Sequence, residues 1–431
     1  MSLAERDAQV IWHPFTVQKN MPLPIAIVQG KGSLLIDDNG NEYIDAISSW
    51  WVTIHGHANP YIAQKIYEQA LQLEQVIFAG FTHEPAVELA EKLLTILPAN
   101  FSKIFYSDNG STSTEVALKM AIQYWWNQRN LADGSLKSEI VPTKILAFNN
   151  SYHGDTFGAM SMSDRSVFTM AFKDLLFEVI FIDTPTPENL HQTLQTIESN
   201  ANSIAAFIYE PLVQGAGGMN MYEPSLLNSI LQAVQQHNII CIADEVMTGF
   251  GRTGKLFASE YMPIKPDIIC LSKGLTGGTM ALGVTACSLK IYNAFVSNDK
   301  LKTFFHGHSF TANPLACTAA IASFNLLQQN NSIAIVEWIT EQNIQFAQQL
   351  KQYEPSIINI RTLGTILAFE INVGKKEYLN NIATTVTQQA LNEGVYIRPL
   401  GNTVYIMPLY CITKDELAKI YSTIVKIIEA V

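Results

Sequence analysis

Short apolar runs alternate with amphipathic stretches through the middle of the chain. Between several runs the apolar positions recur at helical spacing, as in Thr114–Asn127 and Leu226–His237. Seven runs have the pattern of buried strands: Ile104–Tyr106, Lys144–Phe148, Val179–Ile182, Ile204–Tyr209, Ile239–Ala243, Ile268–Leu271 and Gly283–Ser288. Strands that alternate with helices predict an α/β domain, with a mainly parallel seven-stranded sheet covered on both faces.

The two ends of the chain follow a different pattern. A long helix over about Pro314–Gln328 leads into shorter elements, and residues 394–409 predict two strands around a turn at Gly401-Asn402. A chain of 431 residues favours two domains over one. We expect a large domain over 56–315 and a smaller α+β domain over 316–431, which begins with the connecting helix. The N-terminal segment 1–55 is expected to pack with the smaller domain.

Composition narrows the classes of function. The net charge of −11, with no long basic run, argues against a nucleic-acid or anionic-membrane surface. Five widely spaced cysteines with no Cys-x-x-Cys pair favour a reducing compartment without disulfides or a zinc site. No apolar run approaches the roughly 20 residues of a membrane span, and the N-terminus has no apolar signal core. The sequence predicts a soluble cytoplasmic protein without a metal centre.

Glycines and polar residues follow the carboxyl ends of five predicted strands. In open parallel sheets, ligands bind beyond these ends. The segments concerned are SDNGST (107–112), NNSYHGDT (149–156), EPLVQGAGG (210–218), DEVMTGFGRTG (244–254) and SKGLTGG (272–278). Because they should meet at one edge of the sheet, they predict a single site.

The chemistry of that site depends first on Lys273, because a lysine that ends a core strand is rarely buried unpaired. Asp244 ends another buried strand, so the two could simply form a buried salt bridge. Alternatively, a partly desolvated lysine becomes a nucleophile towards an aldehyde, and Asp244 could hold a proton on a ring nitrogen.

Other residues at this edge also have two interpretations. Gly110 and Ser111 fit a plain turn and N-cap, or a phosphate site at a helix N-terminus. Tyr152 fits a core aromatic or a ring stacked on a flat cofactor. An amine, a carboxylate, an anion site and an aromatic ring together match the needs of pyridoxal 5′-phosphate (PLP).

Two long segments carry a family resemblance. IADEVMTGFGRTG and DIICLSKGLTGG resemble the signature of the class III aminotransferases, PLP-dependent transferases of fold type I. The resemblance covers nearly the whole chain and implies amino-group transfer by a ping-pong route in a homodimer with shared active sites. Met247 stands where many members carry glutamine, which disfavours an ornithine- or 4-aminobutyrate-type enzyme. The stretches IWHPF, SSWWVTIHGH, SYHGDTFGAMSM and EPLVQGAGGMNMY resemble one branch of the family.

The resemblance also implies roles for individual residues. The catalytic set is Lys273, which links to the cofactor and moves the proton, Asp244, which keeps the ring nitrogen protonated, and Tyr152, which stacks on the ring. The other cofactor contacts would be Gly110, Ser111, Glu210 and Val246, with Asp155 in support, and His308 and Ser309 from the partner subunit.

For small-molecule substrates, the resemblance implies contacts with Phe15, Trp50, Trp51, Tyr152, Lys273, Gly307 and Arg398. The tryptophans suit an alkyl chain, although a buried pair is equally ordinary core. Arg398 would hold a distant carboxylate, or form a strand-end surface salt bridge. Phe15 and His308 depart from the tyrosine and proline that the family often has. Three alternatives stay open at this point: another ω-aminotransferase, a PLP aminomutase and a non-catalytic PLP-binding protein.

Overall fold

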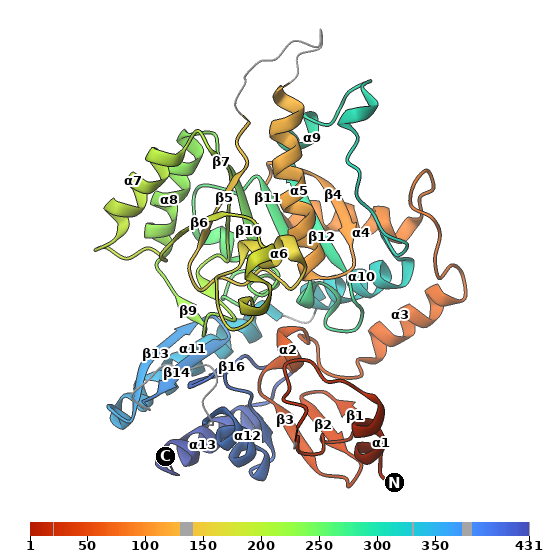
Figure 1. The fold of residues 1–431 in the computed structure, drawn as a ribbon. Coiled ribbons are helices and arrows are strands. Elements are labelled where there is room, and N and C mark those ends of the chain that lie inside the picture. Colours follow the sequence, from red (N-terminus) through yellow and green to blue (C-terminus); the bar gives the residue numbers. More distant parts are fainter. Residues whose placement is uncertain (20, 130–140, 330–331, 373–381, 431) are drawn as a thin grey trace.

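The structure, a computed structural model, describes residues 1–19, 21–129, 141–329, 332–372 and 382–430 (Figure 1). Its largest sheet has seven strands in the order β4 (Phe101–Ser107), β12 (Gly283–Ser288), β11 (Ile268–Leu271), β10 (Ile240–Asp244), β7 (Ile204–Tyr209), β5 (Lys144–Phe148) and β6 (Val179–Ile182). All pairs are parallel except those of β12, which runs antiparallel to both neighbours. The predicted mainly parallel, seven-stranded sheet is therefore confirmed.

Both faces of this sheet are buried, and successive residues of a strand pack into different cores. In β10, Ile240 and Ile242 join the core that contains Val116 and Ala117 of helix α5 (Gly110–Arg129). Cys241 and Ala243 join the opposite core, with residues of α4 (Glu84–Ile96) and α8 (Pro224–Gln236). Burial on both faces explains why these strands are continuous apolar runs in the sequence.

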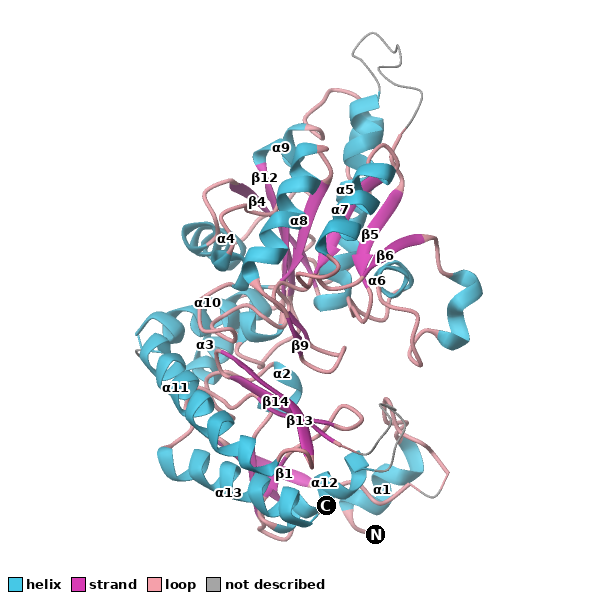
Figure 2. Cartoon of the chain, turned by 90° about the vertical axis from the view of Figure 1, so that its left-hand side faces the viewer, coloured by secondary structure: helices cyan, strands magenta, loops and turns pink. Residues whose placement is uncertain are grey.

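Helices connect the strands and border the sheet (Figure 2). The remaining helices are α1 (Leu3–Val10), α2 (Ser48–Trp51), α3 (Pro60–Ala70), α6 (Phe157–Met162), α7 (Leu190–Asn200), α9 (Leu289–Asn293), α10 (Pro314–Gln329), α11 (Ser332–Leu350), α12 (Ile382–Asn392) and α13 (Lys414–Ala430). The predicted helix over Pro314–Gln328 is confirmed by α10. Within the described ranges, no helix combines the length and the apolar character needed to cross a bilayer.

The described part of the chain also forms smaller sheets. One contains β1 (Ile27–Lys31), β2 (Leu34–Asp37), β3 (Glu42–Asp45) and β15 (Val395–Tyr396). Another contains β13 (Ile357–Leu363), β14 (Ile366–Ile371) and β16 (Thr403–Ile406), and the short strands β8 (Val213–Gln214) and β9 (Asn220–Met221) form a hairpin. The parallel pairing of β15 with β3 supports our proposal that residues 1–55 belong with the C-terminal domain.

The two strands predicted in residues 394–409 are present as β15 and β16, on either side of the predicted turn. The turn exists, since Leu400 and Thr403 bond to each other and Gly401 has a φ of 61°. The flanking strands do not pair, because β15 joins β3 whereas β16 joins β14. Pro399 lies between them and has no N–H to donate to a ladder, so the chain leaves one sheet there and enters the other.

Candidate functional site

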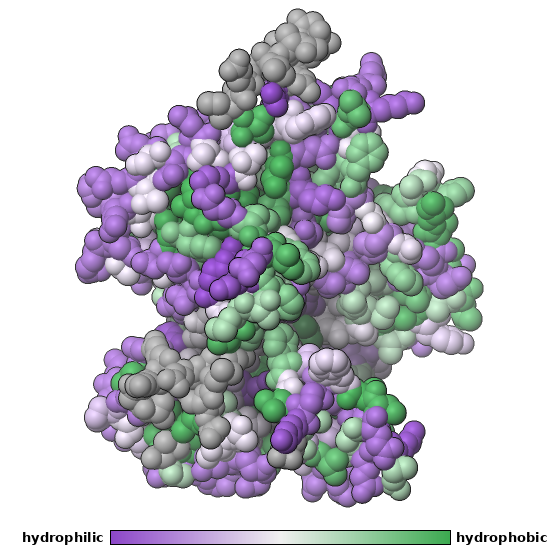
Figure 3. Space-filling view, viewed as in Figure 1, coloured by the Kyte–Doolittle hydropathy of each residue, from purple (hydrophilic) through white to green (hydrophobic). Residues whose placement is uncertain are grey.

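A cavity of about 660 Å³ lies at the carboxyl edge of the large sheet. The segments that follow β4, β5, β7, β10 and β11 all contribute to its lining. It brings together nine residues expected from the sequence: Trp51, Gly110, Ser111, Tyr152, Asp155, Glu210, Asp244, Val246 and Lys273. The space-filling view shows a recess between the upper and lower parts of the molecule, bordered by apolar side chains (Figure 3).

Lys273 opens the turn after β11 and has a φ of 47°, in the left-handed region that non-glycine residues seldom occupy. Burial lowers the pKa of its amine to about 8, although Asp244 and Glu210 act in the opposite direction. Its Nζ lies over the Trp51 ring, 4.5 Å from the centroid. No ion pair joins Lys273 to Asp244 in the described part of the chain, so the buried salt bridge is not formed.

Asp244 is instead held by His153, a residue that the sequence left without a role. His153 Nδ1 lies 2.7 Å from Asp244 Oδ2, and both side chains are buried. The other carboxylate oxygen accepts from the backbone N–H of Val246 at 3.1 Å. The only sequence signal for His153 was its place beside Tyr152 at a strand end. Asp244 therefore presents a fixed, hydrogen-bonded carboxylate to the cavity.

Glu210, directly after β7, is a further hydrogen-bonded carboxylate in the cavity wall. Its carboxylate accepts from the backbone N–H groups of Tyr152 at 3.0 Å and Gly215 at 2.9 Å. Burial raises the pKa of Glu210 to about 7, with a smaller contribution from Asp244 in the same direction. Burial also raises the pKa of the Tyr152 phenol well above its ordinary value. Tyr152 is therefore neutral at physiological pH, and Glu210 fixes its backbone.

The N-terminus of α5 also lines the cavity. A Cβ added at Gly110 would lie 2.7 Å from Val246 Cγ1, and one at Gly154 would lie 2.2 Å from Ser111 Oγ. Ser111 Oγ also accepts from the backbone N–H of Asp155 at 3.2 Å. The two glycines allow the chain segments to close around the helix N-terminus, where free N–H groups favour an anion.

These features fit PLP. The amine of Lys273 suits its aldehyde, the carboxylate of Asp244 suits its ring nitrogen, and the helix N-terminus at Gly110 and Ser111 suits its phosphate. Across the described residues, no group of three or more His, Cys, Asp or Glu side chains could hold a metal ion.

A second cavity, of about 830 Å³, adjoins the first and shares Trp51, Tyr152 and Lys273 with it. It also contains Phe15, Trp50 and Arg398 from the predicted substrate set. Trp51 is 4% exposed and donates from Nε1 to the hydroxyl of Tyr405 at 2.9 Å.

Trp50 also lines this cavity and is 43% exposed. The Arg398 guanidinium stands 5.1 Å from its ring centroid, and the Phe15 ring meets it edge-on at 5.6 Å. The cavity is therefore an aromatic channel lined by the amine of Lys273 and the guanidinium of Arg398. Arg398 stacks on Trp50 and forms no ion pair with a carboxylate of the described residues, so the surface salt bridge is not observed.

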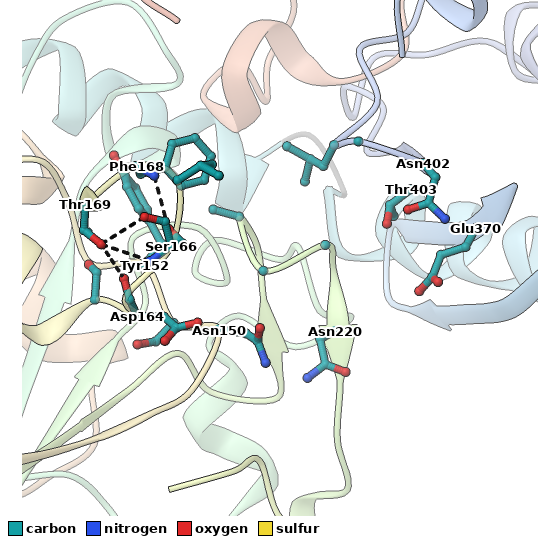
Figure 4. A pocket seen from close by; sticks show the side chains of 18 of the residues that line it. Asn150, Tyr152, Asp164, Ser166, Phe168, Thr169, Asn220, Glu370, Asn402 and Thr403 are labelled. Carbon is teal, nitrogen blue, oxygen red and sulfur yellow. Dashed lines mark hydrogen bonds between the residues drawn. The ribbon is translucent and has the colours of Figure 1, made fainter. Parts of the chain in front are cut away.

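A third cavity, of about 770 Å³, lies beside the channel (Figure 4). Tyr152 and Phe168 lie on its wall and also line the second cavity. The loop that carries Phe168 is closed by Thr169, whose hydroxyl donates to the carbonyl groups of Asp164 and Ser166. The loop thus separates the channel from this more polar space.

Gly307, His308 and Ser309 do not join the Lys273 cavity. They line a different cavity of about 640 Å³, together with Gln75 and Phe78. Gln75 Nε2 donates to the Ser309 carbonyl at 2.5 Å. A single chain therefore does not bring this loop to the site, and its action from a partner subunit stays a prediction.

Comparisons with known proteins agree with this geometry. Adenosylmethionine-8-amino-7-oxononanoate aminotransferase of Synechococcus elongatus is 46% identical, over 98% of this chain and 99% of that protein. The Helicobacter pylori protein of the same name is 37% identical, over 99% and 98%. The crystal structure of the Methanocaldococcus jannaschii protein of that name superposes with a TM-score of 0.92 at 33% identity, covering 99% and 98% of the two chains.

Solved amine transaminases share the architecture as well. One from an uncultivated Pseudomonas species, in its PLP-bound form, gives a TM-score of 0.90 at 27% identity and covers 98% of both chains. The family model for class-III aminotransferases matches residues 15–428, nearly the full length. The chain therefore belongs to the class-III aminotransferases.

Proposed function

We propose that this protein transfers an amino group from S-adenosylmethionine to the ketone of 8-amino-7-oxononanoate, giving 7,8-diaminononanoate for biotin synthesis. The observation that carries the proposal is the aromatic channel that leads from Lys273 past Trp50 and Trp51 and contains Arg398. Its walls suit an alkyl chain, and its guanidinium suits a terminal carboxylate. The acceptor has both, and the relatives that match this chain over nearly its full length are named for that reaction.

PLP is the cofactor in this proposal and supplies, when bound, an electron sink for the carbanion that forms as the amino group is transferred. Lys273 takes and returns the proton at the reacting carbon. Its pKa of about 8 leaves a useful neutral fraction near neutral pH. Asp244, oriented by His153, holds the proton on the ring nitrogen. Gly110 and Ser111 at the start of α5 bind the phosphate.

The same site serves donor and acceptor in turn, as a ping-pong route requires. Tyr152 and Lys273 line both the cofactor cavity and the channel, so a substrate that enters the channel reaches the amine directly. Tyr152 would hold the cofactor ring and exclude water from the side of the cavity that it lines. Arg398 lies along the channel, where it would hold the acceptor's carboxylate at the far end of the alkyl chain, whereas the α-carboxylate of S-adenosylmethionine is adjacent to the amine that reacts.

A homodimer is part of the proposal. The loop with Gly307, His308 and Ser309 is flanked by exposed large apolar residues, Phe305 and Phe310, and Ile77 and Phe81 are exposed as well. Exposed apolar side chains of this size suit a protein interface, and a second copy would bring the loop to the partner's phosphate site. We place the enzyme in the cytoplasm, in keeping with its cysteine content and charge.

The donor is the least constrained part of the proposal. The net charge of −11 attracts a cationic donor but does not separate S-adenosylmethionine from lysine. The half-exposed face of Trp50 offers a surface on which a flat, cation-bearing nucleoside can stack, so we favour S-adenosylmethionine.

The test is a product assay with purified holoenzyme and 8-amino-7-oxononanoate, against S-adenosylmethionine, lysine and simple amines as separate donors. We expect 7,8-diaminononanoate by mass spectrometry, fastest with S-adenosylmethionine. Product with lysine alone would reverse the choice of donor. Rapid turnover of simple amines without diaminononanoate would favour an ω-aminotransferase, the reading that the amine transaminase fold supports. Isomerisation of a substrate with no donor present would indicate an aminomutase.

A further inference from the structure

The channel wall is built on a turn with unusual backbone geometry. Ser48, Ser49 and Trp51 all have positive φ, at 54°, 60° and 66°. Residues other than glycine rarely adopt this backbone conformation, and here three of them fall within four residues. Such a turn persists only when its surroundings hold it in place.

The group that holds the turn is the carboxylate of Asp45, the last residue of β3. Asp45 is fully buried. Its Oδ2 accepts from the backbone N–H of Ser49 at 2.6 Å and from the Ser49 hydroxyl at 3.3 Å. Its Oδ1 accepts from the backbone N–H of Ile47 at 3.2 Å. The carboxylate therefore bonds the chain on both sides of the first strained residue.

His57 completes the environment of the carboxylate. Its Nε2 lies 2.9 Å from Asp45 Oδ2, and its backbone is fixed by a pair of hydrogen bonds with Gly32. A buried carboxylate needs such partners to remain in place. Asp45 thus links the turn to the small sheet, next to which α2 lies (Figure 1).

The strand register extends this link to the other side of the channel. Asp45 is paired with Tyr396 of β15, and the backbone N–H of Ala46 donates to the Tyr396 carbonyl at 3.2 Å. Arg398 follows two residues after Tyr396, and its guanidinium stacks on Trp50. The pair of β3 and β15 thus leads to both Trp50 and Arg398 in the channel wall, and Asp45 is the last residue of β3.

We propose that Asp45 is a positioning residue that fixes the Ser48–Trp51 turn and thereby sets the affinity for the acceptor. This rests on the proposed function in so far as the channel is the acceptor's site. Asp45 does not line the cofactor cavity, so its loss should disturb the fit of the acceptor more than the rate of the chemical step.

The test is Asp45→Asn in the holoenzyme, because an amide cannot accept hydrogen bonds at both ends. If the amide oxygen of the new asparagine accepts from the Ser49 N–H, its NH₂ group faces the Ile47 N–H, which loses its acceptor. In the reverse orientation the Ser49 N–H loses its acceptor. We expect the KM for 8-amino-7-oxononanoate to rise about tenfold, as for the loss of one bond to a charged group, with kcat at saturation little changed. The matched control is Asp267→Asn, since Asp267 also accepts from a backbone N–H, that of Cys241 at 3.0 Å, but lies directly before β11, at the amino edge of the large sheet and outside the channel. An equal rise of KM in the control, or none in Asp45→Asn, would overturn the proposal.

A second readout does not depend on the reaction. Acrylamide quenching of tryptophan fluorescence is measured for each protein with Trp50 in place and again with Trp50→Phe. The difference between the two measurements isolates the signal of Trp50 from that of the other tryptophans. In Asp45→Asn the quenching of Trp50 should increase, because the turn is no longer held. Unchanged quenching would count against the proposal even if the wild-type protein uses another acceptor. Absence of diaminononanoate from the wild type would refute only the proposed function.

If Asp45→Asn does not fold, two variants of His57 test the positioning role of Asp45 instead. His57→Gln keeps an N–H donor near Asp45, whereas His57→Leu removes it. We expect the KM for the acceptor to rise in His57→Leu and to stay near wild type in His57→Gln. If both variants keep the wild-type KM, or both raise it equally, the positioning role is refuted.

Discussion

Replacing Lys273 with methionine should stabilise the cofactor-free protein, although it removes the residue on which turnover depends. Methionine has a similar length and carries no charge. Lys273 lies where burial lowers the pKa of its amine from an ordinary value of about 10.5 to about 8. The folded protein therefore disfavours the ammonium form, and that cost disappears with the charge.

The size and the pH window of the effect follow from the two pKa values. Their difference of about 2.5 corresponds to at most about 3.4 kcal/mol. Lys273 lines a cavity open to water and interacts with the Trp51 ring, so we discount the gain to about 1–2 kcal/mol. Below pH 8 both the folded and unfolded states hold the proton, and the full cost applies. Between about 8 and 10.5 the unfolded state binds more protons, so wild-type stability rises with pH and the advantage of the variant vanishes.

The assay is urea unfolding of both proteins after removal of cofactor, at pH 7 and again at pH 10. The free energy of unfolding of Lys273→Met should exceed that of the wild type at pH 7 and approach it at pH 10. Lys351→Met, on the exposed surface, controls for the general effect of the substitution. A less stable Lys273→Met at pH 7, or a difference that ignores pH, would refute the assignment of a desolvated amine.

Four further outcomes test the site. Asp244→Asn should keep the fold but lower kcat about 100-fold or more, because an amide cannot stabilise a protonated ring nitrogen; near-normal steady-state rates would contradict its role. Gly154→Ala should weaken PLP binding in a titration of the cofactor-free protein, because its Cβ would meet Ser111; an unaltered affinity would speak against close packing there. Arg398→Ala should slow the acceptor half-reaction more than the donor half-reaction in single-turnover measurements, and equal losses would argue against a carboxylate clamp. Phe15→Tyr adds one hydroxyl, which is worth about 0.5–1.5 kcal/mol, so either half-reaction should change by about tenfold at most.

The large sheet was predictable because burial on both faces leaves a simple pattern in the sequence. Most positions of each strand are apolar, so the seven runs stand out from the amphipathic helices between them. The position of the site followed from the same topology, because carboxyl ends of parallel strands share an edge. Lys273 and Asp244 could therefore be placed together although 29 positions separate them.

Contacts that depend on orientation could not be predicted in this way. The bond between His153 and Asp244 joins residues 91 positions apart, and neither periodicity nor spacing indicates it. The sequence also left open a salt bridge between Lys273 and Asp244 as the alternative to a cofactor site, because a shared edge does not determine which side chains meet. The separate sheets of β15 and β16 could not be predicted either, because each strand has its partner far away in the sequence.

The Ser48–Trp51 turn shows the limit most clearly, because local preference argues against its observed geometry. Serine and tryptophan disfavour positive φ, so no reading of SSWW alone would predict three such residues. The turn is possible because Asp45 is buried beneath it, and Asp45 is placed by a strand pair with Tyr396, which lies far along the chain. The shape of the channel is thus set by tertiary contacts that overrule local propensity. A substitution in β15 that shifts the register should therefore alter Trp50 as well as Arg398, although β15 contains neither residue.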